Sequence, residues 1–314
     1  MKIAFLEPLG IPEEELNAAV RAAVGAEVEL VYYPDRRVDT ETLVQRCEGA
    51  DAVVLSNFPF RAEVMERCPA LKFVCVAFTG VDHVDVDYCR THGIAVSNCA
   101  GYSTVAVADL VFGLVIGLAR NILPCDARCR AGGVKDGLVG FELEGKTFGV
   151  IGTGAIGSRV ARIANAFGCR VLAWSRTERE LPDVEYVELD TLLQESDIVS
   201  LHVPQTAQTV GLIGEAELKK MKKSAFLINT ARGPVVQSAA LAAALRDGVI
   251  AGAGVDVFDK EPPLDPEDPL LHAPNLLCTP HVAFATRQAF EKRAVIVGEN
   301  LAAWLRGETI NKIC

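Results

Sequence analysis

The sequence has no apolar run long enough to cross a lipid bilayer. The longest one, residues 110–119, lies between Asp109 and Arg120 and is far shorter than the roughly 20 residues that a transmembrane helix needs. Basic residues are fewer than acidic ones, with 31 lysines and arginines against 41 aspartates and glutamates. The resulting net charge of −10 argues against a nucleic-acid partner. The first residues lack the pattern of a signal peptide. We therefore expect a cytoplasmic protein with neither a membrane nor a nucleic-acid partner.

Metal-binding patterns are missing as well. Cys125 and Cys129 are spaced to touch a metal ion, but no second pair of cysteines or histidines with suitable spacing accompanies them, so we expect no metal site. The 10 cysteines, without a signal peptide, indicate reduced thiols. Because half of the 314 residues are hydrophobic and no low-complexity tract occurs, we expect a folded chain of two domains.

What the chain does contain is an alternation of strand-like and helix-like segments. In the first hundred residues, short apolar runs alternate with amphipathic patterns, and a second such series starts near Thr147. The expected strands are 2–6, 28–33, 52–56, 71–77 and 95–97, then 148–151, 170–174, 198–201, 225–229, 252–255 and 276–278. Strands separated by helices indicate right-handed βαβ units and parallel sheets.

The predicted fold class is therefore α/β, with two parallel-sheet domains. We expect a flavodoxin-like substrate domain from residues 1–98 together with 285–314, and a Rossmann dinucleotide-binding domain from residues 99–284. The last thirty residues are interpreted as one more helix that ends near Arg306 and Gly307. Two domains of this kind normally leave a cleft in which small molecules bind.

The strongest functional signal is a glycine-rich turn between a strand and a helix. Gly152, Gly154 and Gly157 follow an apolar run and precede a helical pattern. In a dinucleotide-binding turn the first glycine permits the tight bend, the second lets the pyrophosphate approach, and the third lets the helix pack close to the strand. The pyrophosphate then lies on N–H groups at the helix start, here those of Ala155 and Ile156.

The residues that follow the next strand determine whether such a domain binds NADP or NAD. An acidic residue there would bind the ribose 2′-hydroxyl of NAD, but this chain has Ser175, Arg176 and Thr177, with no carboxylate before Glu178. Hydroxyl groups and a guanidinium suit a 2′-phosphate, which favours NADP as the cofactor. The alternative is that Arg176 is an ordinary surface residue, with its field weakened by Glu178, and that the cofactor is NAD.

Three polar side chains follow expected strand ends in the second domain. They are Arg232, Glu261 and His281, and Asp256 lies directly after the strand 252–255 that precedes Glu261. The carboxyl ends of parallel strands face the ligand crevice, so these side chains are expected to converge there. Taken singly, each has an ordinary interpretation: a surface cation, a solvated loop carboxylate and a residue at a helix start.

Taken in order, these segments resemble the D-isomer-specific 2-hydroxyacid dehydrogenase family, over almost the whole chain. The likeness is greatest to the branch of glyoxylate and hydroxypyruvate reductases, also called glycerate dehydrogenases. The matching segments are 152–157, 228–233, 254–258, 261–262 and 279–281. Ordered agreement across these motifs is far more specific than any one of them.

The resemblance implies a role for each of these side chains. His281 matches the general acid–base that protonates the carbonyl oxygen, and Glu261 matches the carboxylate that stabilises the protonated imidazole. Arg232 matches the residue that binds the substrate carboxylate. Asp256 resembles the residue that receives the nicotinamide carboxamide, and Thr104 is expected near the cofactor phosphates.

The first domain should complete the substrate site. Phe78, Thr79 and Gly80 match the family's anion-binding turn, and Gly80 permits a nest of backbone N–H groups. Phe284 in the second domain is expected, with Phe78, to limit substrate size. One departure concerns Ala100, where many relatives carry proline, and it puts the rigidity of the interdomain hinge in doubt.

These observations predict an oxidoreductase that reduces glyoxylate or hydroxypyruvate to the D-2-hydroxy acid with NADPH. Val76 stands where phosphoglycerate-specific relatives place a phosphate-contacting arginine, and we expect no regulatory domain after Cys314. A larger apolar 2-oxo acid is the alternative substrate. A non-catalytic protein of this fold that senses dinucleotides is the alternative function. The resemblance also implies a homodimer formed through the second domain.

Overall fold

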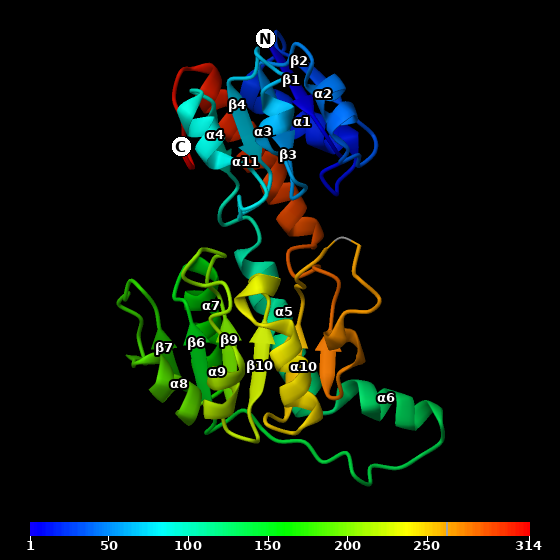
Figure 1. The fold of residues 1–314 in the computed structure, drawn as a ribbon, viewed down its shortest axis with the longest axis vertical. Helices are drawn as coiled ribbons and strands as arrows, with labels where there is room; N and C mark the ends of the chain where they lie inside the picture. Colours follow the sequence, from blue (N-terminus) through cyan, green and yellow to red (C-terminus); the bar gives the residue numbers. More distant parts are fainter. Residues whose placement is uncertain (262) are drawn as a thin grey trace. The chain divides into compact units, whose positions relative to one another are not determined.

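The computed structural model describes residues 1–261 and 263–314, which form two compact units. Unit 1 comprises Met1–Ser103 and Ala285–Cys314, and unit 2 comprises Thr104–Phe284. Each unit is built on one sheet whose strand pairs are all parallel (Figure 1). The expected α/β class with two parallel sheets is therefore confirmed. Pro262, part of one family motif, lies outside the described residues.

Unit 1 contains a five-stranded sheet in the order β2-β1-β3-β4-β5. This is the strand order of flavodoxin-like folds, as predicted. The strands are β1 (Lys2–Phe5), β2 (Glu29–Tyr32), β3 (Ala52–Leu55), β4 (Phe73–Val76) and β5 (Ala95–Asn98). The helices are α1 (Glu13–Val24), α2 (Thr40–Cys47), α3 (Ala62–Met65), α4 (Val86–Thr91) and α11 (Arg287–Leu305). β3 and β4 are buried along their whole length, which explains their continuous apolar sequence.

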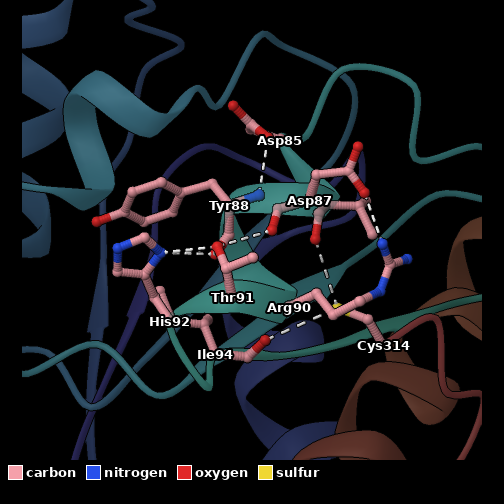
Figure 2. Close-up of polar contacts among 9 residues, drawn as sticks. Asp85, Asp87, Tyr88, Arg90, Thr91, His92, Ile94 and Cys314 are labelled. Carbon is pink, nitrogen blue, oxygen red and sulfur yellow. Dashed lines mark hydrogen bonds and ion pairs between the residues drawn. The ribbon is translucent and has the colours of Figure 1, made fainter.

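Local contacts hold α4 and the end of the chain together (Figure 2). The Asp85 carboxylate accepts the N–H of Tyr88 (3.0 Å) and so caps the helix. The rings of Tyr88 and His92 stack with centroids 3.8 Å apart. Cys314 Sγ approaches the carbonyl oxygens of Val86 in α4 (3.9 Å) and of Ile94 after it (3.8 Å). These contacts give Asp85 and His92 structural roles.

Unit 2 contains a seven-stranded sheet in the order β12-β11-β10-β9-β6-β7-β8. If β6 is counted as strand 1 and the sheet is read from β8 to β12, the order is 3-2-1-4-5-6-7. This is the Rossmann order 3-2-1-4-5-6 with one strand added, so the expected dinucleotide-binding architecture is confirmed. The strands are β6 (Thr147–Ile151), β7 (Arg170–Trp174), β8 (Val184–Tyr186), β9 (Ile198–Leu201), β10 (Phe226–Asn229), β11 (Gly252–Val255) and β12 (Leu276–Cys278). The helices are α5 (Thr104–Ala119), α6 (Ile122–Arg130), α7 (Ala155–Ala166), α8 (Leu189–Glu195), α9 (Glu215–Lys220) and α10 (Ser238–Arg246), with short 3₁₀ turns at Gly233–Val235 and Pro269–His272.

Two elements of unit 2 were not expected from the sequence. The predicted set of strands lacks β8, and no helix is predicted at α6. β8 has three residues, none of them fully buried, so it is too short to show an alternating pattern. α6 has no buried residue, so it lacks the apolar stripe by which a helix is recognised.

The long apolar segment at the start of unit 2 is a core helix. α5 packs against β10 and β11, and most of its apolar residues are buried. In the part of the chain that the structure describes, no single helix has the length and apolar character to cross a membrane. α5 and α6 meet the length and composition criteria only as a pair, bent by 57°.

Candidate active site

The predicted site residues of unit 2 share one edge of its sheet. β10, β11 and β12 pair in parallel register, with Asn229 opposite Val255 and Val255 opposite Cys278. Every strand of this sheet ends at the same edge, because all pairs are parallel. The glycine turn after β6 and the segments after β10, β11 and β12 therefore leave the sheet on the ligand-binding side of such folds.

At this edge His281 and Glu261 form a close pair. His281 Nδ1 lies 2.6 Å from Glu261 Oε1, and both side chains are mostly buried, with 18% and 14% exposed. The second carboxylate oxygen of Glu261 accepts the N–H of Phe258 (3.1 Å). The carboxylate is thus anchored to the backbone before it contacts the ring. This is the arrangement of an imidazole oriented by a carboxylate for proton transfer.

Asp256 shapes the segment that carries His281. Its buried carboxylate accepts the N–H groups of Val282 and Ala283, each at 2.9 Å, and the hydroxyl of Thr279. Burial raises the pKa of Asp256, and these hydrogen bonds oppose that rise. Its carbonyl oxygen accepts the N–H of His281 (2.7 Å). The segment holds His281 at φ 52°, a left-handed conformation that costs energy in a non-glycine residue and persists only where surrounding contacts impose it.

Arg232 is presented by a tightly fixed turn after β10. The Asn229 side chain accepts the N–H of Ala231 (3.1 Å) and donates to the carbonyl oxygen of Arg232 (3.0 Å). A Cβ atom on Gly233 would lie 2.1 Å from the carbonyl group of Phe258. Only glycine therefore allows the Arg232 turn to approach the segment that leads to Glu261. The guanidinium Nη1 of Arg232 donates to Ala231 O (2.7 Å).

The glycine turn has the shape that a dinucleotide requires. A Cβ atom on Gly157 would lie 1.9 Å from Gly152 O, and Gly152 has φ 95°, so both positions need glycine. Gly154 has nothing within 4 Å of its Cβ position, which leaves space beside the backbone. No side chain caps the start of α7 at Ala155, so its first N–H groups are available to an anion. The residues present thus fit the pyrophosphate of a dinucleotide.

The segment predicted to select NADP leaves β7 beside this turn. Ser175 Oγ accepts the N–H of Thr153 (3.3 Å), while Arg176 and Thr177 are exposed. Across the described parts of the chain, Arg176 forms no hydrogen bond and no ion pair with Glu178. The guanidinium is therefore not committed to a protein carboxylate. Thr104 is the first residue of α5 and opens unit 2.

The candidates of unit 1 follow β4. The carbonyl oxygen of Thr79 accepts the Asn98 side chain (2.7 Å), which fixes the turn, and Gly80 is partly exposed. Phe78 is buried, with 5% exposed, and its ring lies 6.2 Å from that of Tyr102. In unit 1 the Phe78 ring therefore belongs to the core, and its part in limiting substrate size stays a prediction.

Comparison with known proteins decides the family. Residues 112–283 match the family described as "D-isomer specific 2-hydroxyacid dehydrogenase, NAD binding domain". A glyoxylate reductase of Korarchaeum cryptofilum is 42% identical, with 85% of this chain and 83% of the relative covered. A glycerate dehydrogenase of Methylorubrum extorquens is 40% identical, with 99% of this chain and 98% of the relative covered. An acyclic imino acid reductase, solved with NADPH and D-Arg, superimposes over the full length of both chains with a TM-score of 0.91 at 31% identity.

The chain belongs to this family. It is therefore an oxidoreductase with a nicotinamide-dinucleotide-binding domain, and the predicted family is confirmed. The matched range of this D-2-hydroxyacid dehydrogenase contains the glycine turn, Arg232, Asp256, Glu261 and His281. Within the residues that the structure describes, no group of three or more potential metal ligands is assembled.

Two residues that contact each other in the dinucleotide-binding unit of this dehydrogenase were not predicted as site residues. Tyr186, at the end of β8, donates its hydroxyl to Thr153 Oγ1 (3.0 Å). Thr153 could have been noticed, because it lies inside the glycine turn. Tyr186 gave no signal, because it is 33 residues away in the chain on a strand that the sequence did not reveal.

Proposed function

We propose that this dehydrogenase reduces glyoxylate or hydroxypyruvate to the D-2-hydroxy acid, with NADPH as the hydride donor. The observation that carries the proposal is the 2.6 Å contact between His281 Nδ1 and Glu261 Oε1, at the sheet edge that also bears the glycine turn. The relatives named glyoxylate reductase and glycerate dehydrogenase, at 42% and 40% identity, support the substrate class.

The chemistry follows from the three side chains. When bound, the reduced nicotinamide supplies a hydride to the substrate's carbonyl carbon. Because Glu261 contacts Nδ1 of His281, the proton for the carbonyl oxygen comes from the other ring nitrogen, Nε2. The Glu261 carboxylate stabilises the protonated ring before transfer. The Arg232 guanidinium binds the substrate carboxylate through its two parallel N–H donors and so fixes the position of the carbonyl group.

The two predicted domains divide the remaining tasks in this proposal. Residues 1–98 with 285–314 form the substrate domain, where N–H groups of the turn at Phe78, Thr79 and Gly80 bind the substrate carboxylate. Residues 99–284 form the cofactor domain, where Thr104 lies near the phosphates and Asp256 receives the carboxamide as well as holding the His281 segment. We place the activity in the cytoplasm, where thiols stay reduced, and all 10 cysteines are free.

A comparison of kcat/KM for small and bulky 2-oxo acids tests the proposed substrate. The ring of Phe284 meets that of His281 edge-on, with centroids 5.5 Å apart, so it stands beside the proposed acid. Wild type is expected to show a higher kcat/KM for glyoxylate and hydroxypyruvate than for phenylpyruvate and 2-oxoisocaproate. Phe284→Ala should shift the ranking toward the bulky acids by about 1–3 kcal/mol, or roughly 5- to 150-fold.

The control for this measurement is Phe167→Ala, at the exposed C-terminal end of α7, which should leave the ranking unchanged. A wild-type preference for the bulky pair would establish the alternative substrate. The absence of turnover with every acid and both cofactors would instead favour the dinucleotide-sensing alternative.

Arg176→Ala tests the cofactor. The exposed guanidinium has no partner among the described residues, and a charge-assisted hydrogen bond typically contributes about 1.5–3 kcal/mol. The KM for NADPH should therefore rise roughly tenfold or more, with that for NADH nearly unchanged. Arg179→Ala, which removes another exposed cation of the same loop, is the control. Equal losses with both cofactors, or a wild-type preference for NADH, would count against NADPH.

α6 supports a homodimer formed through unit 2. This helix has no buried residue, yet Ile122 and Leu123 are apolar, and Val139 in the following stretch is 85% exposed. In unit 2, α6 and this stretch extend away from the sheet (Figure 1). Apolar surface of this kind is typical of contacts between subunits.

Leu123→Lys is therefore expected to convert a dimer into a monomer in sedimentation or light-scattering measurements. Val210→Lys, which places the same charge on another exposed valine of unit 2, should leave the dimer intact. A monomeric wild type, or a Leu123→Lys protein that stays dimeric, would rule out this interface.

A further inference from the structure

Two residues outside the segment 175–179 hold it against the glycine turn. Thr153 donates its N–H to Ser175 Oγ (3.3 Å) and its hydroxyl to Thr177 O (3.4 Å). The hydroxyl of Tyr186 accepts the N–H of Arg179 (2.9 Å). The segment is therefore fixed at every second residue.

The two hydroxyl groups are joined to each other. Tyr186 donates its hydroxyl proton to Thr153 Oγ1 (3.0 Å), so one chain of hydrogen bonds runs from the N–H of Arg179 through both hydroxyls to Thr177 O. We call this pair, Tyr186 and Thr153, the hydroxyl relay. Each hydroxyl accepts one hydrogen bond and donates one, an arrangement in which neighbouring bonds strengthen each other. Thr153 is itself fixed, because it is 1% exposed and its carbonyl oxygen accepts the hydroxyl of Ser158 (2.9 Å).

The sheet places Tyr186 where this contact is possible. β8 is the edge strand next to β7, and Tyr186 pairs in parallel register with Ala173, one residue before β7 ends. The tyrosine thus leaves the sheet beside the point where the segment 175–179 begins. Between the fixed positions, the side chains of Arg176 and Glu178 are exposed and make no hydrogen bond or ion pair within the described part of the chain.

We propose that Tyr186 is a specificity-determining positioning residue, which acts through the hydroxyl relay to hold Ser175 and Arg176 ready for the 2′-phosphate of NADPH. The proposal rests on the proposed use of NADPH. Its physical basis is preorganisation, because a segment that is already ordered loses less conformational entropy when it binds. NADH has no phosphate at this position and therefore gains little from the order. The relay contacts the adenosine end of the cofactor site, so kcat at saturation should not depend on it.

Tyr186→Phe tests the proposal, because it removes only the hydroxyl. Calorimetric titration should show NADPH and adenosine 2′,5′-bisphosphate binding about three- to tenfold more weakly, the range of one neutral hydrogen bond. NADH affinity should change less than twofold, and kcat with saturating NADPH should stay at the wild-type value. The matched control is Tyr32→Phe in unit 1, where the lost hydroxyl bonds to Asn17 instead.

Two further variants separate positioning from general stability. Thr153→Val breaks the relay and should reproduce the Tyr186→Phe pattern, whereas Thr153→Ser keeps the hydroxyl and should restore most of the affinity. If Tyr186 acts through Arg176, the double variant Tyr186→Phe/Arg176→Ala should bind NADPH no more weakly than Arg176→Ala alone. Additive losses, or equal losses for NADPH and NADH, overturn the proposal.

The outcomes also distinguish this proposal from the proposed function. Suppose that wild type prefers NADPH, that Arg176→Ala abolishes this preference and that Tyr186→Phe has no effect. The relay proposal is then wrong, and the cofactor assignment stands. If wild type binds NADH more tightly than NADPH, the cofactor assignment is wrong and the relay proposal falls with it.

Discussion

Replacement of His281 by alanine is expected to lower kcat for glyoxylate reduction by about 10²–10⁴-fold, the usual contribution of a positioned acid–base group. The expectation rests on the 2.6 Å contact with Glu261 and on the left-handed backbone, φ 52°, at which the Asp256 contacts hold the residue. The measurement is steady-state turnover with saturating NADPH. A thermal unfolding curve on the same sample shows whether the variant is folded.

Two companion variants make this result specific. His272→Ala removes another histidine of unit 2, exposed and bonded through its ring to Pro266 O, and should leave turnover unchanged. Glu261→Gln keeps the shape of the pair but removes its charge, and should lower turnover by roughly 10- to 100-fold, the value of a hydrogen bond to a charged group. Turnover near the wild-type level in a folded His281→Ala protein would exclude this residue from the mechanism.

Alanine at two glycines of the same turn should have different consequences for stability. At Gly157 a Cβ atom would lie 1.9 Å from Gly152 O, so Gly157→Ala must displace the backbone of the turn. We expect it to destabilise unit 2 by more than the about 1–3 kcal/mol typical of overpacking, and to abolish dinucleotide binding. At Gly154 nothing lies within 4 Å of the Cβ position, and φ −66° suits alanine. Gly154→Ala should therefore fold normally yet bind NADPH much more weakly, because its methyl group occupies the space that the pyrophosphate approaches.

The measurements are urea unfolding and NADPH titration of each variant. Gly113→Ala, in α5, is the control: its nearest neighbour, Leu110 Cδ1, lies 4.0 Å away, and alanine in a helix interior should raise stability by about 0.5–1 kcal/mol. Unimpaired NADPH affinity in Gly154→Ala would show that the pyrophosphate does not approach this glycine. A fully stable Gly157→Ala would show that the turn can rearrange.

The fold class was predictable from the sequence because the signals that define it are local. Buried parallel strands are continuous apolar runs, and amphipathic helices lie between them, so β3, β4 and β10 were placed to within a few residues. The amphipathic pattern of residues 40–47 coincides with α2, Thr40–Cys47. The glycine turn was equally clear, since its three glycines are needed for backbone conformation and close approach within one short segment.

The candidate site was predictable in part. Arg232, Asp256, Glu261 and His281 could be named because each lies just beyond the end of a strand, and parallel strands end at one edge. The sequence did not indicate that the Asp256 carboxylate would bind Val282 and Ala283, because that contact joins segments 26 and 27 residues apart.

Other features depend only on tertiary structure. β8 forms because it pairs with the edge of β7 through backbone hydrogen bonds. Its three residues are too few to show a strand pattern in the sequence. The contact between Tyr186 and Thr153 depends on it. α6 is a helix without a buried face, so hydrophobic periodicity does not show it. The sequence by itself determined the residues that bear the chemistry and the two sheets that carry them, because both depend on short-range pattern. The tertiary structure decided how those residues are held, because the hydrogen bonds that hold them join segments that only the folded chain brings together.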